Sequence, residues 1–294
     1  MNIKNFKTVE AVIPSLFTLE GEGFEINRAF PTPQWNYFDP FLLLDEMGPA
    51  VHAPHSAKGA PDHPHRGFET VTYLLDGEFE HKDSAGNYGK IKKGGVQWMT
   101  AGSGVVHSEL PSSDFQKTGG RLHGFQLWVN LPASHKMRAP RYQEKDPEDI
   151  PFFEENGFKV KIIAGSIYGV EAKIETIVPF IYWHFIIEPN IQLEIPTPNI
   201  NDKYNIFSYI ISGSGKFEQN GKLYNKGNSV VFNKTNDDIL HVESGVDGVE
   251  FLILGGIPIG EPVARYGPFV MNTKEEIYQA FEDYQSGKMG KISH

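Results

Sequence analysis

The sequence has 294 residues, 39% of them hydrophobic and 22% charged, which is the composition of a folded globular protein with room for two domains or one large barrel. Its formal net charge of −10 gives no electrostatic reason for direct binding to nucleic acid or to anionic lipid. The absence of cysteine excludes disulfides, zinc ribbons, thiol nucleophiles and cysteine-ligated clusters, so any metal must be held by nitrogen and oxygen donors.

The remaining composition points to short strands in a cytoplasmic protein. Glycine and proline contribute 30 and 20 residues, about 17% against an average of about 12%, so many turns are needed. No apolar run of about 18 residues is present, so we expect no membrane partner. The first residues lack the apolar core of a signal peptide, which makes the cytoplasm the expected location.

The first fifty residues are predicted to form strands and loops. Strands are expected at residues 9–13, at 24–30, where apolar and polar side chains alternate, and at 41–47, which is apolar and ends in acids. The proline-containing stretch 48–62 is expected to be an exposed loop.

Residues 62–109 carry the chemistry. In an extended strand, residues i and i+2 project to the same face, so His63 and His65 should point together, and so should His107 and Glu109. About three strands separate the two pairs, enough for one barrel wall to bring them face to face. The arrangement predicts a mononuclear metal site with three imidazoles and one carboxylate.

This donor set limits the metal and suggests a reaction class. Three imidazoles and a carboxylate suit iron, manganese, nickel, copper or cobalt rather than magnesium or calcium. Four protein ligands leave two positions of an octahedral metal open for a chelating substrate, or for a substrate and dioxygen. A carboxylate that loosens from the metal, here Glu109, can also take a proton from a substrate hydroxyl.

The strand expected at 122–131 places Gln126 and Trp128 on one face. If that face is the inner one, Gln126 can hydrogen-bond a metal-bound ligand from just outside the ligand set; the other interpretation is ordinary barrel packing. The proline-rich, highly charged stretch that follows predicts a domain boundary. We therefore expect a metal-binding N-terminal barrel at 1–135, a linker at 136–150 and a C-terminal barrel at 151–294.

The second half repeats the first. Residues 209–213 match 73–77, and the trio 241–243 matches the trio 107–109. Two similar β-barrels in one chain, an all-β architecture, are the natural interpretation.

The second barrel is expected to lack a metal site. In the same register His63 and His65 are replaced by Asn199 and Asn201, so His241 should be structural. One helix is predicted in the tail, capped by Thr273 with Glu276 three residues on, and it should pack against a barrel without a functional role.

The chain resembles the pirin family of the cupin superfamily, whose members are bicupins. The resemblance covers nearly the whole chain and rests on residues 39–45, 62–73, 124–132 and 267–273. It implies two cupin barrels with a single iron in the N-terminal one. The ligand pattern of the family falls on four residues of this sequence: His63, His65, His107 and Glu109.

The resemblance also implies two classes of function. Some pirins cleave quercetin-type flavonols with dioxygen and release carbon monoxide, so our leading hypothesis is a metal-dependent dioxygenase acting on a small chelating phenol. Other pirins are nuclear transcriptional co-regulators with a redox-sensitive iron. The alternative is therefore an iron-bearing regulatory protein that docks onto a protein partner, such as a transcription factor or a metabolic enzyme. An open pocket above the metal would favour the enzyme, as does the absence of a basic targeting segment.

Overall fold

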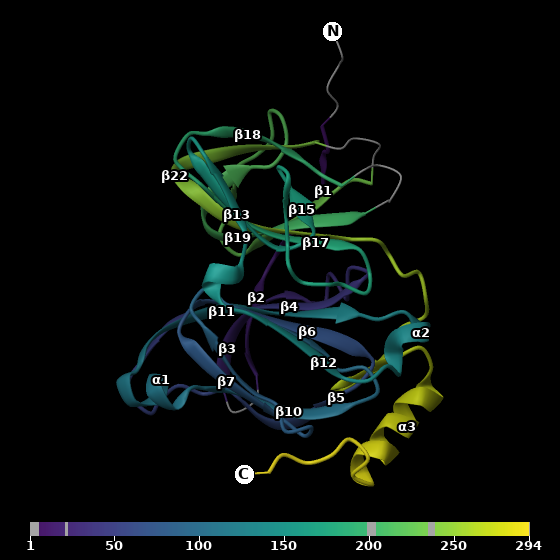
Figure 1. The fold of residues 1–294 in the computed structure, drawn as a ribbon. Coiled ribbons are helices and arrows are strands. Elements are labelled where there is room, and N and C mark those ends of the chain that lie inside the picture. Colours follow the sequence, from purple (N-terminus) through teal and green to yellow (C-terminus); the bar gives the residue numbers. More distant parts are fainter. Residues whose placement is uncertain (1–5, 21–22, 199–203, 235–238, 294) are drawn as a thin grey trace. The chain divides into compact units, whose positions relative to one another are not determined.

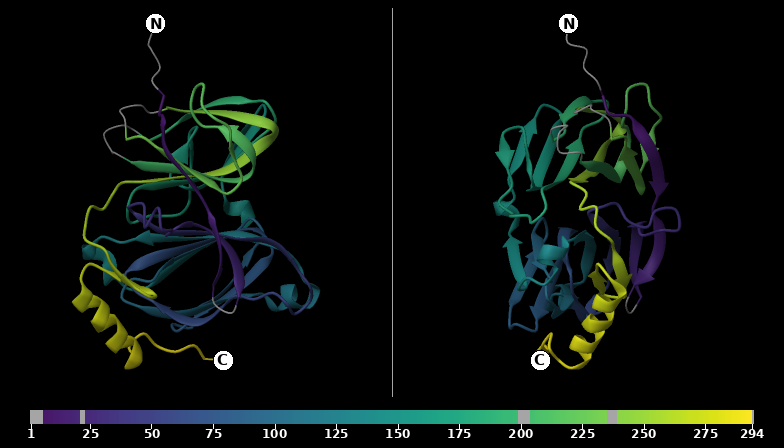
Figure 2. Two further views of the ribbon diagram at one scale, coloured as in Figure 1. Left: turned by 180° about the vertical axis from the view of Figure 1, so that it is seen from behind. Right: turned by 90° about the vertical axis from the view of Figure 1, so that its right-hand side faces the viewer.

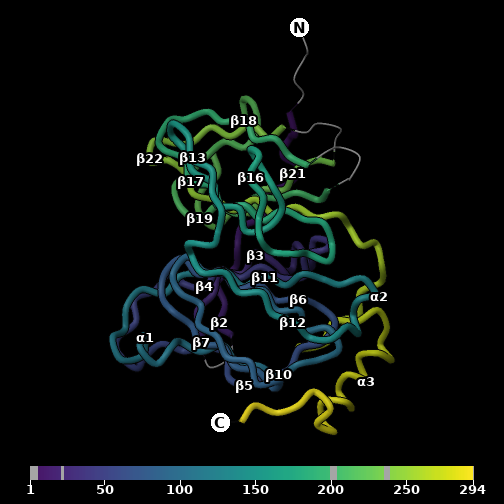
Figure 3. Tube along the Cα trace, in the orientation of Figure 1, coloured from purple at the N-terminus to yellow at the C-terminus, as the bar shows by residue number. Residues whose placement is uncertain are grey.

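The computed structural model describes residues 6–20, 23–198, 204–234 and 239–293. Figures 1 to 3 show that the chain is built mainly from β-strands, which confirms the predicted all-β class. It divides into two compact units. The histidine unit comprises residues 17–31, 40–148 and 259–294, and the second unit comprises residues 1–16, 32–39 and 149–258.

The described residues of the histidine unit form two large antiparallel sheets (Figure 1) and a two-stranded sheet in its C-terminal segment. The larger has the strand order β12-β9-β6-β11-β4-β3-β2, and the smaller has the order β5-β10-β7-β8. The larger sheet consists of β2 (Leu16–Glu20), β3 (Phe24–Phe30), β4 (Phe41–His52), β6 (Phe68–Asp76), β9 (Val96–Thr100), β11 (Gly120–Asn130) and β12 (Arg141–Lys145). The smaller consists of β5 (Ala60–His65), β7 (Glu78–Asp83), β8 (Tyr88–Lys92) and β10 (Val105–Pro111).

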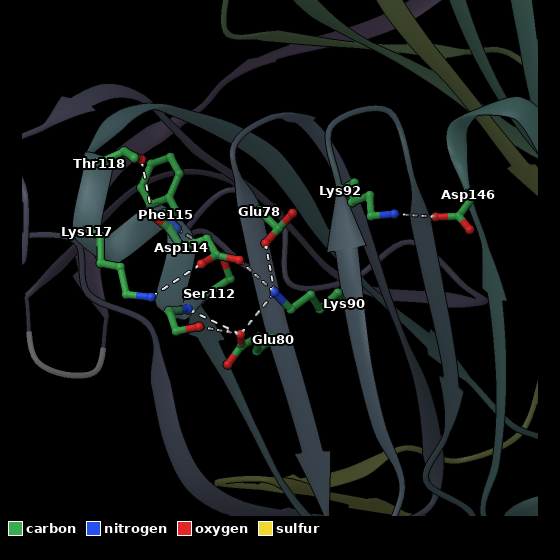
Figure 4. A network of polar contacts seen from close by, with 11 residues as sticks. Glu78, Glu80, Lys90, Lys92, Ser112, Asp114, Phe115, Lys117, Thr118 and Asp146 are labelled. Atoms are coloured by element: carbon green, nitrogen blue, oxygen red, sulfur yellow. Dashed lines mark hydrogen bonds and ion pairs between the residues drawn. The ribbon is translucent and has the colours of Figure 1, made fainter.

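One helix lies beside the smaller sheet, in the stretch after β10. Helix α1 (Ser113–Thr118) is capped by the Ser112 hydroxyl, which accepts from the amide of Phe115. Lys90 on β8 lies 3.2 Å from Asp114 of this helix and 3.4 Å from both Glu78 and Glu80 on β7 (Figure 4). These ion pairs are solvated, so they orient the helix more than they stabilise the fold.

The predicted linker 136–150 contains regular structure, and the chain passes from the histidine unit to the second unit within it, between Glu148 and Asp149. After the short helix α2 (Ala133–Lys136), strand β12 pairs with β9 at the edge of the larger sheet, from Arg141 against Thr100 to Lys145 against Val96. A 3-10 turn (Pro147–Asp149) follows. An edge strand can carry charges on its outer side, so its composition resembles that of a linker.

The predicted loop 48–62 is shorter than expected. Strand β4 continues to His52, pairing with β11, and β5 already begins at Ala60. Only the middle of the stretch is irregular, because the backbone pairing continues past the point where the apolar pattern stops.

The second unit repeats the topology of the first. Its main sheet has the strand order β1-β21-β19-β22-β17-β14-β13, with β18 against β22 and β20 against β19. Tyr73 lies on β6 and Tyr209 on β19, the corresponding strands of the two main sheets, so the predicted repeat is confirmed. The strands are β1 (Val9–Pro14), β13 (Phe152–Glu155), β14 (Phe158–Ala164), β15 (Ser166–Ile167), β16 (Val170–Glu171), β17 (Phe180–Ile187), β18 (Gln192–Pro196), β19 (Asn205–Lys216), β20 (Tyr224–Asn225), β21 (Asn228–Phe232) and β22 (Ile239–Gly256).

The predicted ranges 1–135 and 151–294 do not coincide with the two units. Strand β1 pairs with β21 and belongs to the second unit, whereas residues 259–294 belong to the histidine unit. This last segment forms β23 (Ala264–Tyr266), β24 (Phe269–Met271) and α3 (Lys274–Gln285). A composition boundary marks where a chain is polar, not which core its later segments join.

Helix α3 is the predicted tail helix. Thr273 and Glu276 form the expected capping box, which is confirmed. Ile277 and Ala280 are buried against Phe269 and Val106, both in the histidine unit. The helix therefore packs within the histidine unit. Among the described residues, no helix combines the length and the apolar character needed to cross a membrane.

The interior of the second unit is filled by apolar side chains, and Phe251 on β22 is at its centre. Its side chain is fully buried, stacks on Phe185 with ring centroids 5.3 Å apart and meets Phe217 edge-on at 5.0 Å. We expect Phe251→Ala to lower the free energy of unfolding by about 3–5 kcal/mol, because the surrounding side chains cannot fully fill the cavity that the lost ring leaves. Urea unfolding followed by tryptophan fluorescence measures the change.

A matched control is available on the same strand. Val246 is 76% exposed, so Val246→Ala should change the free energy of unfolding by less than about 0.5 kcal/mol. Equal losses in the two variants would contradict a packed interior around Phe251.

Candidate metal centre

Two neighbouring strands of the smaller sheet position the histidines. Strands β5 and β10 pair antiparallel, with His107 opposite His63 and Val105 opposite His65. Because His63 and His65 are two residues apart on β5, their side chains project to one face, where the side chain of His107 meets them. The sequence pattern and the strand register together therefore form the cluster.

The structure brings the three predicted histidines together. One ring nitrogen from each of His63, His65 and His107 lies within 4.8 Å of the others, and the ring centroids are 4.3–5.0 Å apart. His65 and His107 are almost entirely buried, and His63 is partly exposed. Among the described residues, this is the group of His, Asp or Glu side chains with the geometry to hold a metal ion.

Backbone carbonyls set the tautomers of two of these rings. His63 Nδ1 lies 2.7 Å from the carbonyl oxygen of Pro61, and His65 Nδ1 lies 3.2 Å from that of Pro268. A carbonyl oxygen only accepts, so each Nδ1 carries the proton and each Nε2 presents a lone pair. The two Nε2 atoms nevertheless lie 3.0 Å apart. Two lone pairs at this distance repel one another unless a cation lies beside both.

Burial keeps the imidazoles neutral, so a proton is a poor candidate for that cation. Desolvation lowers the pKa of His63. Desolvation also lowers the pKa of His65 and of His107 well below the ordinary value, and for these two residues neighbouring histidines lower it further. Neutral imidazole is the form that binds metals.

His107 adds a second sign of a missing partner. Its side chain is fully buried, and neither ring nitrogen has a hydrogen-bond partner among the described residues. Buried polar atoms are rarely left unpaired. Three convergent neutral imidazoles, two with opposed lone pairs and one unsatisfied, are a donor set that suits a single transition-metal ion.

Glu109 lies two residues after His107 on β10, and a bulge in the pairing with β5 separates the two residues. Its carboxylate lies outside the 4.8 Å group of histidine nitrogens. Thr72 on β6 donates to Glu109 Oε1 at 2.5 Å, and Gln126 on β11 makes a long contact of 3.5 Å with Oε2. Burial raises the pKa of Glu109, and these two contacts lower it in part.

Both histidine strands and Glu109 border a cavity of about 550 Å³, within the size range of small-molecule sites. The rest of its lining is largely apolar. Trp128 packs edge-on against His65 with ring centroids 5.1 Å apart. The guanidinium group of Arg265 lies over the Trp128 ring, 4.7 Å from its centroid. Other apolar lining residues are Phe24, Ile26, Leu43, Met47 and Phe79.

The position of Gln126 favours the functional interpretation over plain packing. Its side chain lines the cavity beside Trp128, and its Oε1 lies 2.7 Å from the Thr72 hydroxyl. Sequence reasoning missed Thr72, although Thr70 and Thr72 alternate with apolar residues directly after the histidine pair. It also missed Pro268, whose carbonyl contact with His65 spans 203 residues and has no local signal.

The corresponding residues of the second unit point elsewhere. On β22, Leu240 and Val242 are buried in the interior, so His241 and Glu243 face outward, and Glu243 pairs with Lys216 at 2.8 Å. The predicted replacements Asn199 and Asn201 lie outside the described residues.

Comparison with known proteins now identifies the family. The family model described as Pirin matches residues 23–129, and the model described as Pirin C-terminal cupin domain matches residues 182–290. A pirin-like protein of Solanum lycopersicum is 42% identical over 271 residues, covering 92% of this chain and 89% of the relative. Human pirin is 39% identical over 276 residues, covering 92% of this chain and 90% of the relative.

A solved structure agrees with these matches. Quercetin 2,3-dioxygenase from Acinetobacter baumannii superposes with a TM-score of 0.91 at 33% sequence identity, covering 98% of this chain and all of that chain. With both family models matched and the fold shared over nearly its whole length, the chain belongs to the pirin family.

Proposed function

We propose that this protein is a metal-dependent dioxygenase that cleaves quercetin-type flavonols with dioxygen. In this proposal His63, His65, His107 and Glu109 hold one transition metal, with iron(II) first among iron, copper, nickel, manganese and cobalt. The observation that carries the proposal is the convergence of three histidines, with the Nε2 atoms of His63 and His65 3.0 Å apart, beside a cavity large enough for a small molecule. The shared fold with a quercetin 2,3-dioxygenase supports the choice of reaction.

The cavity suits a planar phenol. Its apolar side chains can cover the rings of a flavonol, whose 3-hydroxyl and neighbouring carbonyl oxygen would then face the histidines. A bound metal supplies Lewis acidity and a common binding point for the substrate oxygens and dioxygen.

In this proposal a side chain of the protein accepts the proton of the substrate hydroxyl. Glu109 accepts the proton of the 3-hydroxyl, which makes the flavonol ring electron-rich enough to react with dioxygen. Thr72 holds Glu109 Oε1, and Gln126 contacts Oε2, so the carboxylate keeps its orientation as it gains the proton.

The cavity also bears on the regulatory alternative. A sealed metal would favour a protein that senses oxidation state through its surface, but here the residues lining the 550 Å³ cavity include His63, His65 and Glu109. Access of a small molecule to the histidines supports the enzyme.

Metal content tests the site directly. His107→Ala should lower the bound metal from about one per chain to near zero after reconstitution, because the remaining ligands form an incomplete set. Metal analysis by mass spectrometry measures it. His241→Ala removes an outward-facing histidine of the second unit and should keep the wild-type content. Equal metal loss in both variants would contradict the assignment.

The dependence of metal affinity on pH follows from the lowered pKa values of the histidines. Protons compete with the metal only below the pKa of each imidazole, and all three values lie below the ordinary value of about 6.5. The affinity for nickel(II) should therefore stay nearly constant from pH 8 to about 6.5 and fall at lower pH. Chelator competition at each pH measures it, and a decline already between pH 8 and 7 would contradict burial as the controlling factor.

Turnover tests the reaction. Protein reconstituted with iron(II) should consume dioxygen and release carbon monoxide with quercetin. Glu109→Gln should lower kcat about 10²- to 10⁴-fold, the usual contribution of a general base. Thr72→Val should have a smaller effect, because it only frees the carboxylate. No turnover with iron, copper, nickel or manganese would refute the proposed activity.

A further inference from the structure

The strand that carries His63 and His65 is held at its end by the C-terminal segment of the chain. His65 Nδ1 lies 3.2 Å from the carbonyl oxygen of Pro268, and the amide of Val270 donates to the carbonyl of Arg66 at 3.1 Å. Arg66 and Phe269 also form a parallel β-bridge. Residues more than 200 positions apart in sequence are thus paired directly at a candidate ligand.

The side chain of Arg66 extends this attachment to helix α3. Arg66 is 4% exposed, and its Nη1 donates to Asp283 Oδ2 at 2.9 Å, while its Nε donates to the carbonyl of Ser103 at 2.7 Å. Asp283 is also buried. A buried guanidinium without this carboxylate would be an unpaired charge, so the ion pair keeps α3 and the end of β5 together.

A third contact lies at Gly67. Gly67 has a φ of +87°, and a Cβ at this position would collide with the carbonyl oxygen of Val270, so the two backbones approach as closely as glycine allows. The ammonium group of Lys136 donates to both carbonyls, at 2.8 Å to Gly67 and 3.2 Å to Val270, and at 2.6 Å to Asn130. Lys136 is itself 1% exposed. Three consecutive residues, from His65 to Gly67, are therefore fixed by the same segment.

We propose that Pro268–Val270 and Asp283 act together as a clamp that positions His65 for metal binding, with Asp283 as the positioning residue. The Pro268 carbonyl holds the proton on Nδ1 of His65, which directs Nε2 toward the other two imidazoles. Asp283, through Arg66, keeps Pro268 in place. The inference rests on the proposed metal site, and it assigns control of metal affinity to a helix that contributes no ligand.

The test compares two variants of the full-length protein on the same helix. Asp283→Ala removes the clamp contact. Thr273→Ala removes the N-terminal cap of α3, which weakens the helix without touching Arg66. The dissociation constant of nickel(II) is measured by chelator competition, well below the melting temperature of each variant. In parallel, nitrogen-15 NMR of the metal-free protein reports the tautomer of the His65 ring, assigned with a His65→Gln sample.

We expect Asp283→Ala to weaken nickel(II) binding about 10- to 100-fold, the range found when partners of metal ligands are removed. It should also convert the single Nδ1-protonated form of His65 into a mixture of tautomers. Thr273→Ala should leave the dissociation constant within about twofold and the tautomer unchanged, and Asp283→Asn, which keeps an oxygen for Arg66, should restore part of the affinity.

The outcomes separate the clamp from the metal site. Wild-type protein that binds nickel(II), together with an Asp283→Ala variant that binds equally tightly and keeps the His65 tautomer, overturns the clamp alone. Equal loss of affinity in Asp283→Ala and Thr273→Ala also overturns it, because general loosening of α3 then explains both. Wild-type protein that binds no nickel(II) overturns the proposed metal site and the clamp together.

Discussion

The convergence of three buried imidazoles is the constraint on which the candidate site depends. The Nε2 atoms of His63 and His65 lie 3.0 Å apart, and their lone pairs repel because each ring has its N–H at Nδ1, where it donates to a backbone carbonyl. Burial disfavours a second proton on either ring. A fold that holds this arrangement must oppose the repulsion with packing, or offset it with a cation. The third imidazole, His107, lies where it can share that cation.

The larger and the smaller sheet of the histidine unit contribute different residues to the candidate site. The smaller sheet carries all three histidines and Glu109, so their spacing follows from strand register. The larger sheet contributes Thr72 and Gln126, which contact the carboxylate of Glu109, and side chains such as Gln126 and Trp128 that line the cavity. The second unit keeps the same strand order but fills its interior with apolar side chains, so the shared topology does not by itself create a site.

The C-terminal segment explains why the predicted domain ranges differ from the two units of the structure. A strand pair and a helix from the end of the chain complete the core around Val106 and Phe269, next to the histidines. The polar stretch near residue 140 carries charges because β12 lies at a sheet edge, directly before the chain passes to the second unit at residue 149. The unit that holds the candidate site is therefore assembled from three separate parts of the sequence.

The sequence alone determined the all-β class, the repeat, the three histidines and the capped tail helix, since each depends on short-range periodicity or on spacing within a strand. It also identified Glu109 and Gln126 as candidates, but their mutual contact through Thr72 required the two sheets to meet. The tertiary structure decided the tautomers of His63 and His65, the extent of the cavity and the attachment of α3. These features arise from backbone carbonyls and buried contacts between distant residues, such as Pro268 with His65 and Asp283 with Arg66, and no local pattern of side chains encodes them.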